Sequence, residues 1–75
     1  MGKLNRLPAR KVIQKLNRAG FVETHRRGSH VYFKSSDGKK FVGVPMHSSK
    51  DVPTGTLYNI VVRQAGLSIE EFNRL

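Results

Sequence analysis

Cysteine and tryptophan are absent from the 75-residue sequence, and only five residues are acidic. The lack of cysteine excludes disulfide bonds and thiolate metal sites, and it suits a reducing cytoplasm. A metal-dependent nuclease needs several carboxylates that converge on one cation, whereas these five are scattered along the chain. No apolar run approaches the length of a membrane span, and no signal peptide is recognisable. We therefore expect a cytoplasmic protein with no metal, no cofactor and no membrane anchor.

Basic residues dominate what is present. The chain has 14 Lys and Arg, for a formal net charge of +9. The first 40 residues hold 11 of these bases and two of the acids, whereas the remainder is balanced. This asymmetry indicates a polyanion or an acidic partner. Nucleic acid comes first, because Lys and Arg neutralise phosphate without special geometry. Plain solubility is the alternative explanation.

Residues 1–75 are expected to form a single domain, because a chain this short buries only one thin core. The spacing of apolar residues predicts the order α-β-β-β-α with a further C-terminal helix. The predicted elements are a helix over residues 8–19, strands over 21–27, 30–35 and 40–44, a loop over 46–53, a helix over 54–65 and a short helix after Ser68. Helices on one face of a three-stranded antiparallel sheet give an α+β fold. Double-stranded-RNA-binding domains share this order of elements.

Individual residues predict where these elements begin and end. Pro8 suits the first helical position, and Gly20 suits the left-handed residue after the helix. Pro45 is expected to end the third strand, because it has no N–H for the ladder. Ser68 and Glu71 have the spacing of a capping box.

Strand alternation separates an inner from an outer face. Val31 and Phe33 are expected to face one way, and His30, Tyr32 and Lys34 the other. The phenylalanines are assigned mainly to the core, together with residues of the third strand and the second helix: Phe21, Phe33, Phe41, Phe72, Val42, Val44, Leu57, Ile60 and Val61.

The histidines are the candidates for chemistry. RNA carries its own nucleophile, the 2′-hydroxyl, so a ribonuclease needs only to move protons and to stabilise a crowded phosphate. Histidine suits proton transfer, because its unperturbed pKa of about 6.5 lies close to cellular pH. Such transfer typically contributes about 10²–10⁴-fold to a rate, and nearby cations stabilise the phosphoryl charge.

His30 is the best placed of the three histidines. It follows Arg26-Arg27-Gly28-Ser29, where two predicted strands meet. Gly28 permits an unusual backbone angle and a close approach by another chain. Ser29 offers a hydroxyl and a backbone N–H to a phosphate, and the basic pair would hold RNA. An ordinary surface histidine at a hairpin is the competing interpretation.

The other candidates have weaker motifs. His25 lies in a strand without a surrounding motif and is expected to be structural or exposed. His47 could approach the same sheet edge, either as a second proton-transfer group or as a residue that orders its loop. Tyr32 could stack on a base or pack under the terminal helix. The basic RNA-binding candidates are Arg26, Arg27, Lys34, Lys39 and Lys40.

Gly28-Ser29-His30 resembles the Gly-Ser-His signature of HicA toxins, and Val44-Pro45-Met46-His47 is similar to their Val-Pro-x-His stretch. Further matches lie at Ala19-Gly20-Phe21, Gly55-Thr56-Leu57, Ile60 and Gln64-Ala65-Gly66-Leu67-Ser68, so the resemblance runs from about residue 8 to residue 73.

The resemblance implies a fold like that of double-stranded-RNA-binding domains and metal-independent cleavage of mRNA. It assigns the catalytic histidine to His30 and makes Gly28 necessary for activity. It also implies a HicB antitoxin as partner. Two other functions fit the composition: a non-catalytic module that binds double-stranded RNA, and a basic adaptor that binds only an acidic protein.

Overall fold

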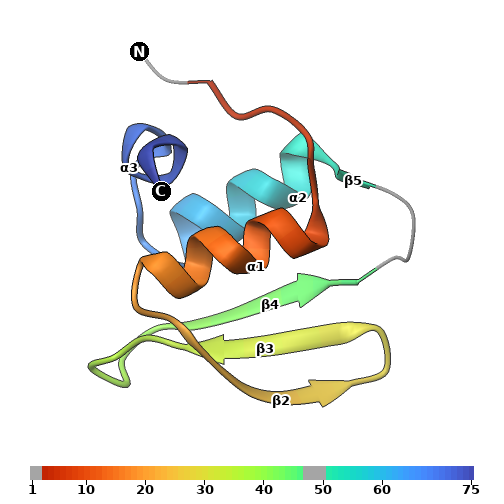
Figure 1. The fold of residues 1–75 in the computed structure, drawn as a ribbon, viewed down its shortest axis with the longest axis vertical. Helices are drawn as coiled ribbons and strands as arrows, with labels where there is room; N and C mark the ends of the chain where they lie inside the picture. The colour runs from red at the N-terminus through yellow and green to blue at the C-terminus, as the bar shows by residue number, and fades with distance from the viewer. Residues whose placement is uncertain (1–2, 47–50) are drawn as a thin grey trace.

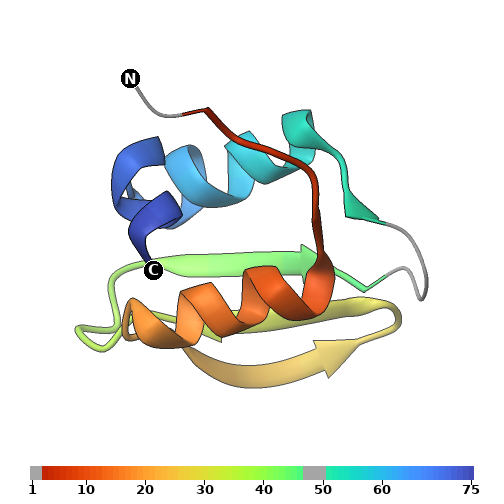
Figure 2. The same cartoon turned by 45° about the horizontal axis from the view of Figure 1, so that its top comes forward.

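A computed structural model describes residues 3–46 and 51–75. In chain order the elements are β1 (Leu7–Pro8), α1 (Ala9–Arg18), β2 (Val22–Arg27), β3 (His30–Lys34), β4 (Phe41–Pro45), β5 (Asp51–Val52), α2 (Thr54–Tyr58), the π-helix η1 (Asn59–Gln64) and α3 (Ile69–Arg74) (Figure 1). Strands β2, β3 and β4 form an antiparallel sheet in that order. The helices lie together on one side of it (Figure 2). The α+β fold, with its likeness to double-stranded-RNA-binding domains, is confirmed.

The core lies between this sheet and the helices. Alternation along β3 and β4 turns Val31, Phe33, Val42 and Val44 inward, as predicted, and each is at least 98% buried. Apolar side chains of the helices cover them: Val12, Leu16, Leu57, Ile60, Val61 and Phe72. Within the described residues, no polar or charged residue is buried and no helix could cross a membrane.

Phe41 was assigned to the core, and this prediction is wrong: its side chain is 63% exposed. It is paired with Lys34 at the end of β4, and the buried Val42 follows it. Because successive residues of a strand point to opposite faces, burial of Val42 turns Phe41 outward.

The third strand was predicted over residues 40–44, with Pro45 ending it; the strand does end there, but Pro45 is itself the last residue of β4 and pairs with His30. The N–H of Gly43 points away from β3 and donates to Gln64 Oε1 at 2.9 Å. Pro45, two residues on, directs its nitrogen to the same free edge, where no ladder donor is required.

Three further boundaries differ from expectation. Pro8 is the N-cap of α1 rather than its first helical residue. The loop predicted over residues 46–53 contains β5, which pairs with β1 in a two-residue ladder. The single helix predicted over residues 54–65 is α-helical only to Tyr58 and then widens into η1.

The C-terminal helix forms as predicted. Ser68 Oγ accepts from the Glu71 N–H, and the Glu71 carboxylate accepts from the Ser68 N–H, which completes the capping box. The hydrogen bond from the Ser68 backbone N–H, followed by the Ser68 side chain, holds the pKa of Glu71 below its ordinary value. Lys15 of α1 donates to the Phe72 and Leu75 carbonyls and lies over the Phe72 ring, so α3 is fastened to α1.

Phe33 and Phe41 provide a matched test of which strand residues face the core and which face solvent. Phe33→Ala should lower the free energy of unfolding by about 3–5 kcal/mol, because it empties a fully buried site. Phe41→Ala should cost less than about 1 kcal/mol, because its ring is exposed. Urea unfolding of both variants measures the difference. Equal losses would contradict the outward orientation of Phe41.

Acid should weaken the capping box in a defined direction. The folded-state pKa of Glu71 lies below its ordinary 4.5, since the Ser68 backbone N–H stabilises the carboxylate. The contribution of Glu71 to the stability of the folded protein is therefore present above pH 4.5, and it is lost as the pH falls through the folded-state pKa. Glu71→Gln should therefore reduce the slope of the free energy of unfolding against pH in the acid range, as measured by urea unfolding at a series of pH values. Glu70→Gln, which changes a carboxylate outside the box, should leave the slope unaltered. An unchanged slope in Glu71→Gln would contradict the proposed link between ionisation of Glu71 and stability.

Candidate functional site

The hairpin between β2 and β3 places His30 at the start of β3. Arg27 and His30 are paired, and Gly28 and Ser29 form the two-residue turn between them. Gly28 has φ +60°, and no residue other than glycine has a positive φ in the described chain. A positive φ at the first turn position alone is typical of a type II′ hairpin turn. The predicted unusual backbone angle of Gly28 is confirmed.

His30 is exposed, and because the next residue, Val31, is buried against the helices, His30 lies on the opposite face of the sheet. Opposite residues of an antiparallel pair share a face, so Arg27 on β2 and Pro45 on β4 flank His30. In the next row, His25 and Gly43 flank Tyr32. The site is therefore an open surface rather than an internal cavity.

Aromatic rings cover this face. The Tyr32 ring stacks on His25 with 4.6 Å between ring centroids, and its centroid lies 6.2 Å from that of His30. A Cβ at Gly43 would lie 3.0 Å from Tyr32 Cε1, so the ring lies against the glycine backbone of β4. Tyr32 thus packs on the sheet itself, and the alternative of packing under the terminal helix is wrong.

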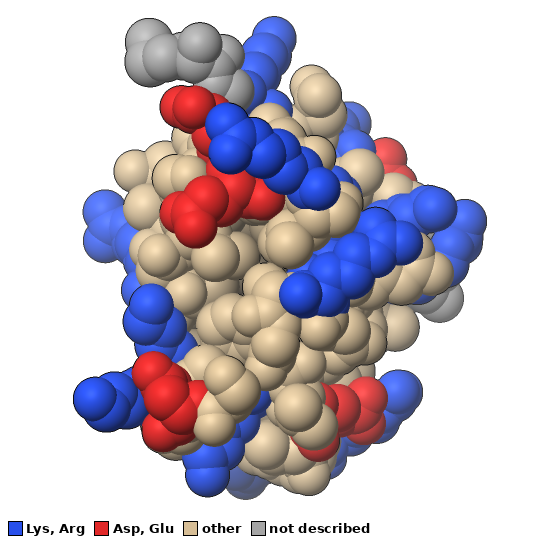
Figure 3. Space-filling model, turned by 60° about the vertical axis from the view of Figure 1, so that its left-hand side comes forward, with Lys and Arg blue, Asp and Glu red and all other residues tan. Residues whose placement is uncertain are grey.

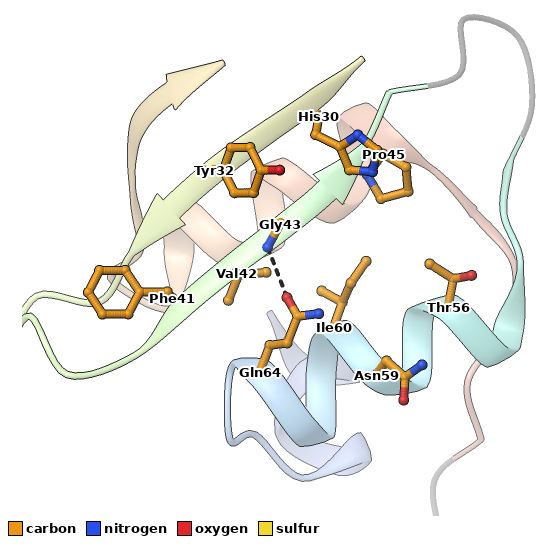
Figure 4. Close-up of a pocket in the computed structure, with 10 residues that line it drawn as sticks. All are labelled: His30, Tyr32, Phe41, Val42, Gly43, Pro45, Thr56, Asn59, Ile60 and Gln64. Atoms are coloured by element: carbon orange, nitrogen blue, oxygen red, sulfur yellow. Dashed lines mark hydrogen bonds between the residues drawn. The ribbon is translucent and has the colours of Figure 1, made fainter. Parts of the chain in front are cut away.

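A groove of about 460 Å³ runs between β4 and the α2–η1 helix. The sheet side carries His30 and Tyr32, and the helix side carries Thr56, Asn59 and Gln64 (Figure 4). Phe41, Val42, Gly43, Pro45 and Ile60 complete the lining. The hydrogen bond from the Gly43 N–H to Gln64 joins the two walls at one end. His30 therefore borders a recess as well as an open face.

The structure brings together only some of the predicted RNA-binding residues. Arg27 lies next to His30, and Lys34 lies on the same face at the other end of β3. Arg26 pairs opposite the inward-facing Val31 and forms an ion pair with Glu23 at 3.1 Å, so it points away from the His30 face.

Lys39 and Lys40 lie in the β3–β4 connection, at the end of the sheet opposite the Gly28 turn. Lys40 also lies close to Gly66. His47, the other histidine considered for proton transfer, lies outside the described residues. The face that Figure 3 displays carries Lys and Arg interspersed with Asp and Glu, not one continuous basic patch. Among the described residues, no three His, Asp or Glu side chains are placed to hold a metal ion.

Sequence reasoning did not find the helical wall of the groove. Thr56, Ile60 and Gln64 recur every four residues, which places them along one side of a helix. This spacing was a usable signal, but Ile60 was interpreted only as a core residue. That β4 lies beside them follows from the tertiary packing.

Fold and surface together define a small α+β domain with an exposed histidine at a glycine hairpin. A family model of the HicA toxin of bacterial toxin–antitoxin systems matches residues 9–67, and the chain belongs to this family. Membership implies an antitoxin partner. A search of curated proteins found no match to the sequence.

Two glycines allow a test of what the Gly28 turn requires. A Cβ would meet nothing within 4 Å at Gly28 or at Gly55, but only Gly28 has a positive φ. Gly28→Ala should therefore destabilise the protein by about 1–2 kcal/mol through backbone strain alone. Gly55→Ala in α2 should be neutral or stabilising by up to about 1 kcal/mol. Thermal unfolding distinguishes them, and two effects of the same sign would refute this account.

Proposed function

We propose that the chain is a metal-independent endoribonuclease that cleaves mRNA, with His30 as the group that transfers a proton, and that a HicB-type antitoxin inhibits it. It would act in the cytoplasm, where its substrate is. The observation that carries this proposal is the exposed His30 imidazole beside the Gly28 turn, with Arg27 paired opposite.

The reaction needs no water and no external nucleophile. The 2′-hydroxyl of the RNA attacks the adjacent phosphorus and loses its proton, while the bond to the 5′ oxygen breaks and that oxygen gains a proton. The products are a 2′,3′-cyclic phosphate and a 5′-hydroxyl. His30 performs one of the two proton transfers, as general base or general acid. Arg27, next to it, stabilises the charge on the phosphoryl oxygens.

The surroundings of His30 favour this role over a structural one. The ring is exposed, so removing it leaves no cavity in the core. Gly28 and Ser29 offer backbone at a tight turn where a phosphate can approach closely. The neighbouring Tyr32 ring offers a partly exposed aromatic surface.

His30→Ala should reduce RNA cleavage by at least about 10²-fold, because one proton transfer is lost. Its free energy of unfolding should change by less than about 0.5 kcal/mol, because the residue is exposed. His25→Ala removes an imidazole from the same face and should retain cleavage within about tenfold, since His25 makes its contacts with Thr24 and Tyr32. In vitro digestion with mapping of product ends measures cleavage by both variants, and urea unfolding measures the stability of His30→Ala.

EDTA should leave the rate unchanged, and the products should end in 2′,3′-cyclic phosphates. Cleavage by purified His30→Ala at the wild-type rate would disprove the assignment. RNA binding without any cleavage by the wild type would instead favour the non-catalytic RNA-binding module.

A further inference from the structure

The groove between β4 and the α2–η1 helix has His30 on its sheet wall, but its other lining residues have no part in the proposed proton transfer. We propose that it binds one unpaired nucleobase of the RNA, next to the phosphate that is cleaved. The proposal rests on the ribonuclease function, and it assigns base selection to residues distinct from the catalytic one.

The chemistry of the lining fits a base rather than a phosphate. None of the ten residues that line the groove is Lys, Arg, Asp or Glu. Apolar surface comes from Phe41, Val42, Pro45 and Ile60. The volume of about 460 Å³ lies in the range of small-molecule sites. The chain is strongly basic as a whole, and Arg27 lies outside the groove on the far side of His30 from Pro45. A phosphate at Arg27 and a base in the groove therefore occupy different surfaces.

Two amide side chains supply directional groups. Gln64 Oε1 accepts the Gly43 N–H at 2.9 Å, which fixes the orientation of the amide. Its NH₂ group remains on the side away from Gly43 (Figure 4). Asn59 adds a second amide on the same helical wall, and Thr56 adds a hydroxyl. Amides both donate and accept, as the edges of bases do.

The helix wall has an unusual local geometry. Asn59 and Gln64 are the first and last residues of the π-helix η1. Ala65 N–H donates to the Ile60 carbonyl, five residues back, at 2.8 Å. Short π-helical segments are uncommon and frequently occur at functional sites. Here the wider turn carries both amides of the groove.

The sheet wall presents aromatic surface. Phe41 is 63% exposed, and Tyr32 lies against Gly43 with its hydroxyl directed toward the His30 end in the view of Figure 4. Exposed aromatic rings beside a basic surface suit base stacking, which is tolerant of sequence. Stacking then supplies affinity, whereas Asn59 and Gln64 discriminate among bases.

The test measures binding of the whole chain to four single-stranded 2′-O-methyl oligonucleotides, each with one repeated base. These cannot be cleaved through a 2′-hydroxyl. Fluorescence anisotropy at fixed salt should show a ratio on the order of tenfold between the best and worst base, the contribution of one or two hydrogen bonds. Backbone amide shifts on titration should change most at Thr56, Asn59 and Gln64.

Matched variants separate base selection from charge. Asn59→Ala removes one amide, and Asn5→Ala is its control outside the groove. Gln64→Glu keeps an oxygen for the Gly43 N–H but removes the NH₂ donor, and Asn5→Asp is the control with the same change in net charge. Both groove variants should bring the ratio between bases close to one, and both controls should leave it unchanged.

Equal binding of all four bases by the wild type would overturn the proposal, as would a preference that survives both groove variants. Groove variants that weaken only the binding of an antitoxin would also overturn it, because the occupant would then be protein. The outcome does not depend on cleavage. A wild type that selects bases but leaves RNA intact would disprove the ribonuclease function alone, and cleavage without base selection would disprove the groove alone.

Discussion

Alternation of side chains along β3 and β4, over a core only one layer thick, is the constraint on which the rest of the structure depends. Val31, Phe33, Val42 and Val44 are buried against the helices, so the residues between them must face solvent. His30, Tyr32 and Phe41 therefore share the open face or its edge, where the Tyr32 ring also stacks on His25 and lies against Gly43. Packing of the core residues on one face of the sheet thus determines which residues lie on the other face.

Glycine shapes this surface at two positions for different reasons. Gly28 provides a positive φ that lets the β2–β3 connection be only two residues long, which places Arg27 opposite His30. Gly43 instead provides space, because the Tyr32 ring occupies the region where a Cβ would be. Gly28 sets the position of Arg27 relative to His30, and Gly43 allows an aromatic ring to lie directly on the sheet. Neither lies in the core.

Edge strand β4 contributes to both the proposed catalytic site and the proposed base-binding groove. Its inner edge pairs with β3, whereas its outer edge meets the helix through the hydrogen bond from Gly43 to Gln64. Pro45 lacks an N–H at that outer edge and borders the groove close to His30. The same strand therefore closes the core, protects a free edge and forms one wall of the groove. In the proposed function, basic residues outside the groove hold the RNA backbone, and the groove, which has no Lys, Arg, Asp or Glu in its lining, receives a base.

Local pattern alone determined the order of the helices and of the three strands of the main sheet, the inner residues of β3, the Gly28 turn, the Ser68–Glu71 capping box and the outward position of His30. Each depends on periodicity or on the conformation of a few neighbouring residues, which the sequence expresses directly. The outward position of Phe41 also follows from its alternation with Val42, although its ring was assigned to the core. Tertiary packing decided the place of Pro45 as the last residue of β4, the π-helical turn and the groove. These depend on which edge of β4 is free and which helix lies beside it, and contacts between distant segments set both. The positions of three basic residues were also decided by tertiary structure: Arg26, Lys39 and Lys40. A sequence shows which residues are charged, but it does not show which face of the fold carries them.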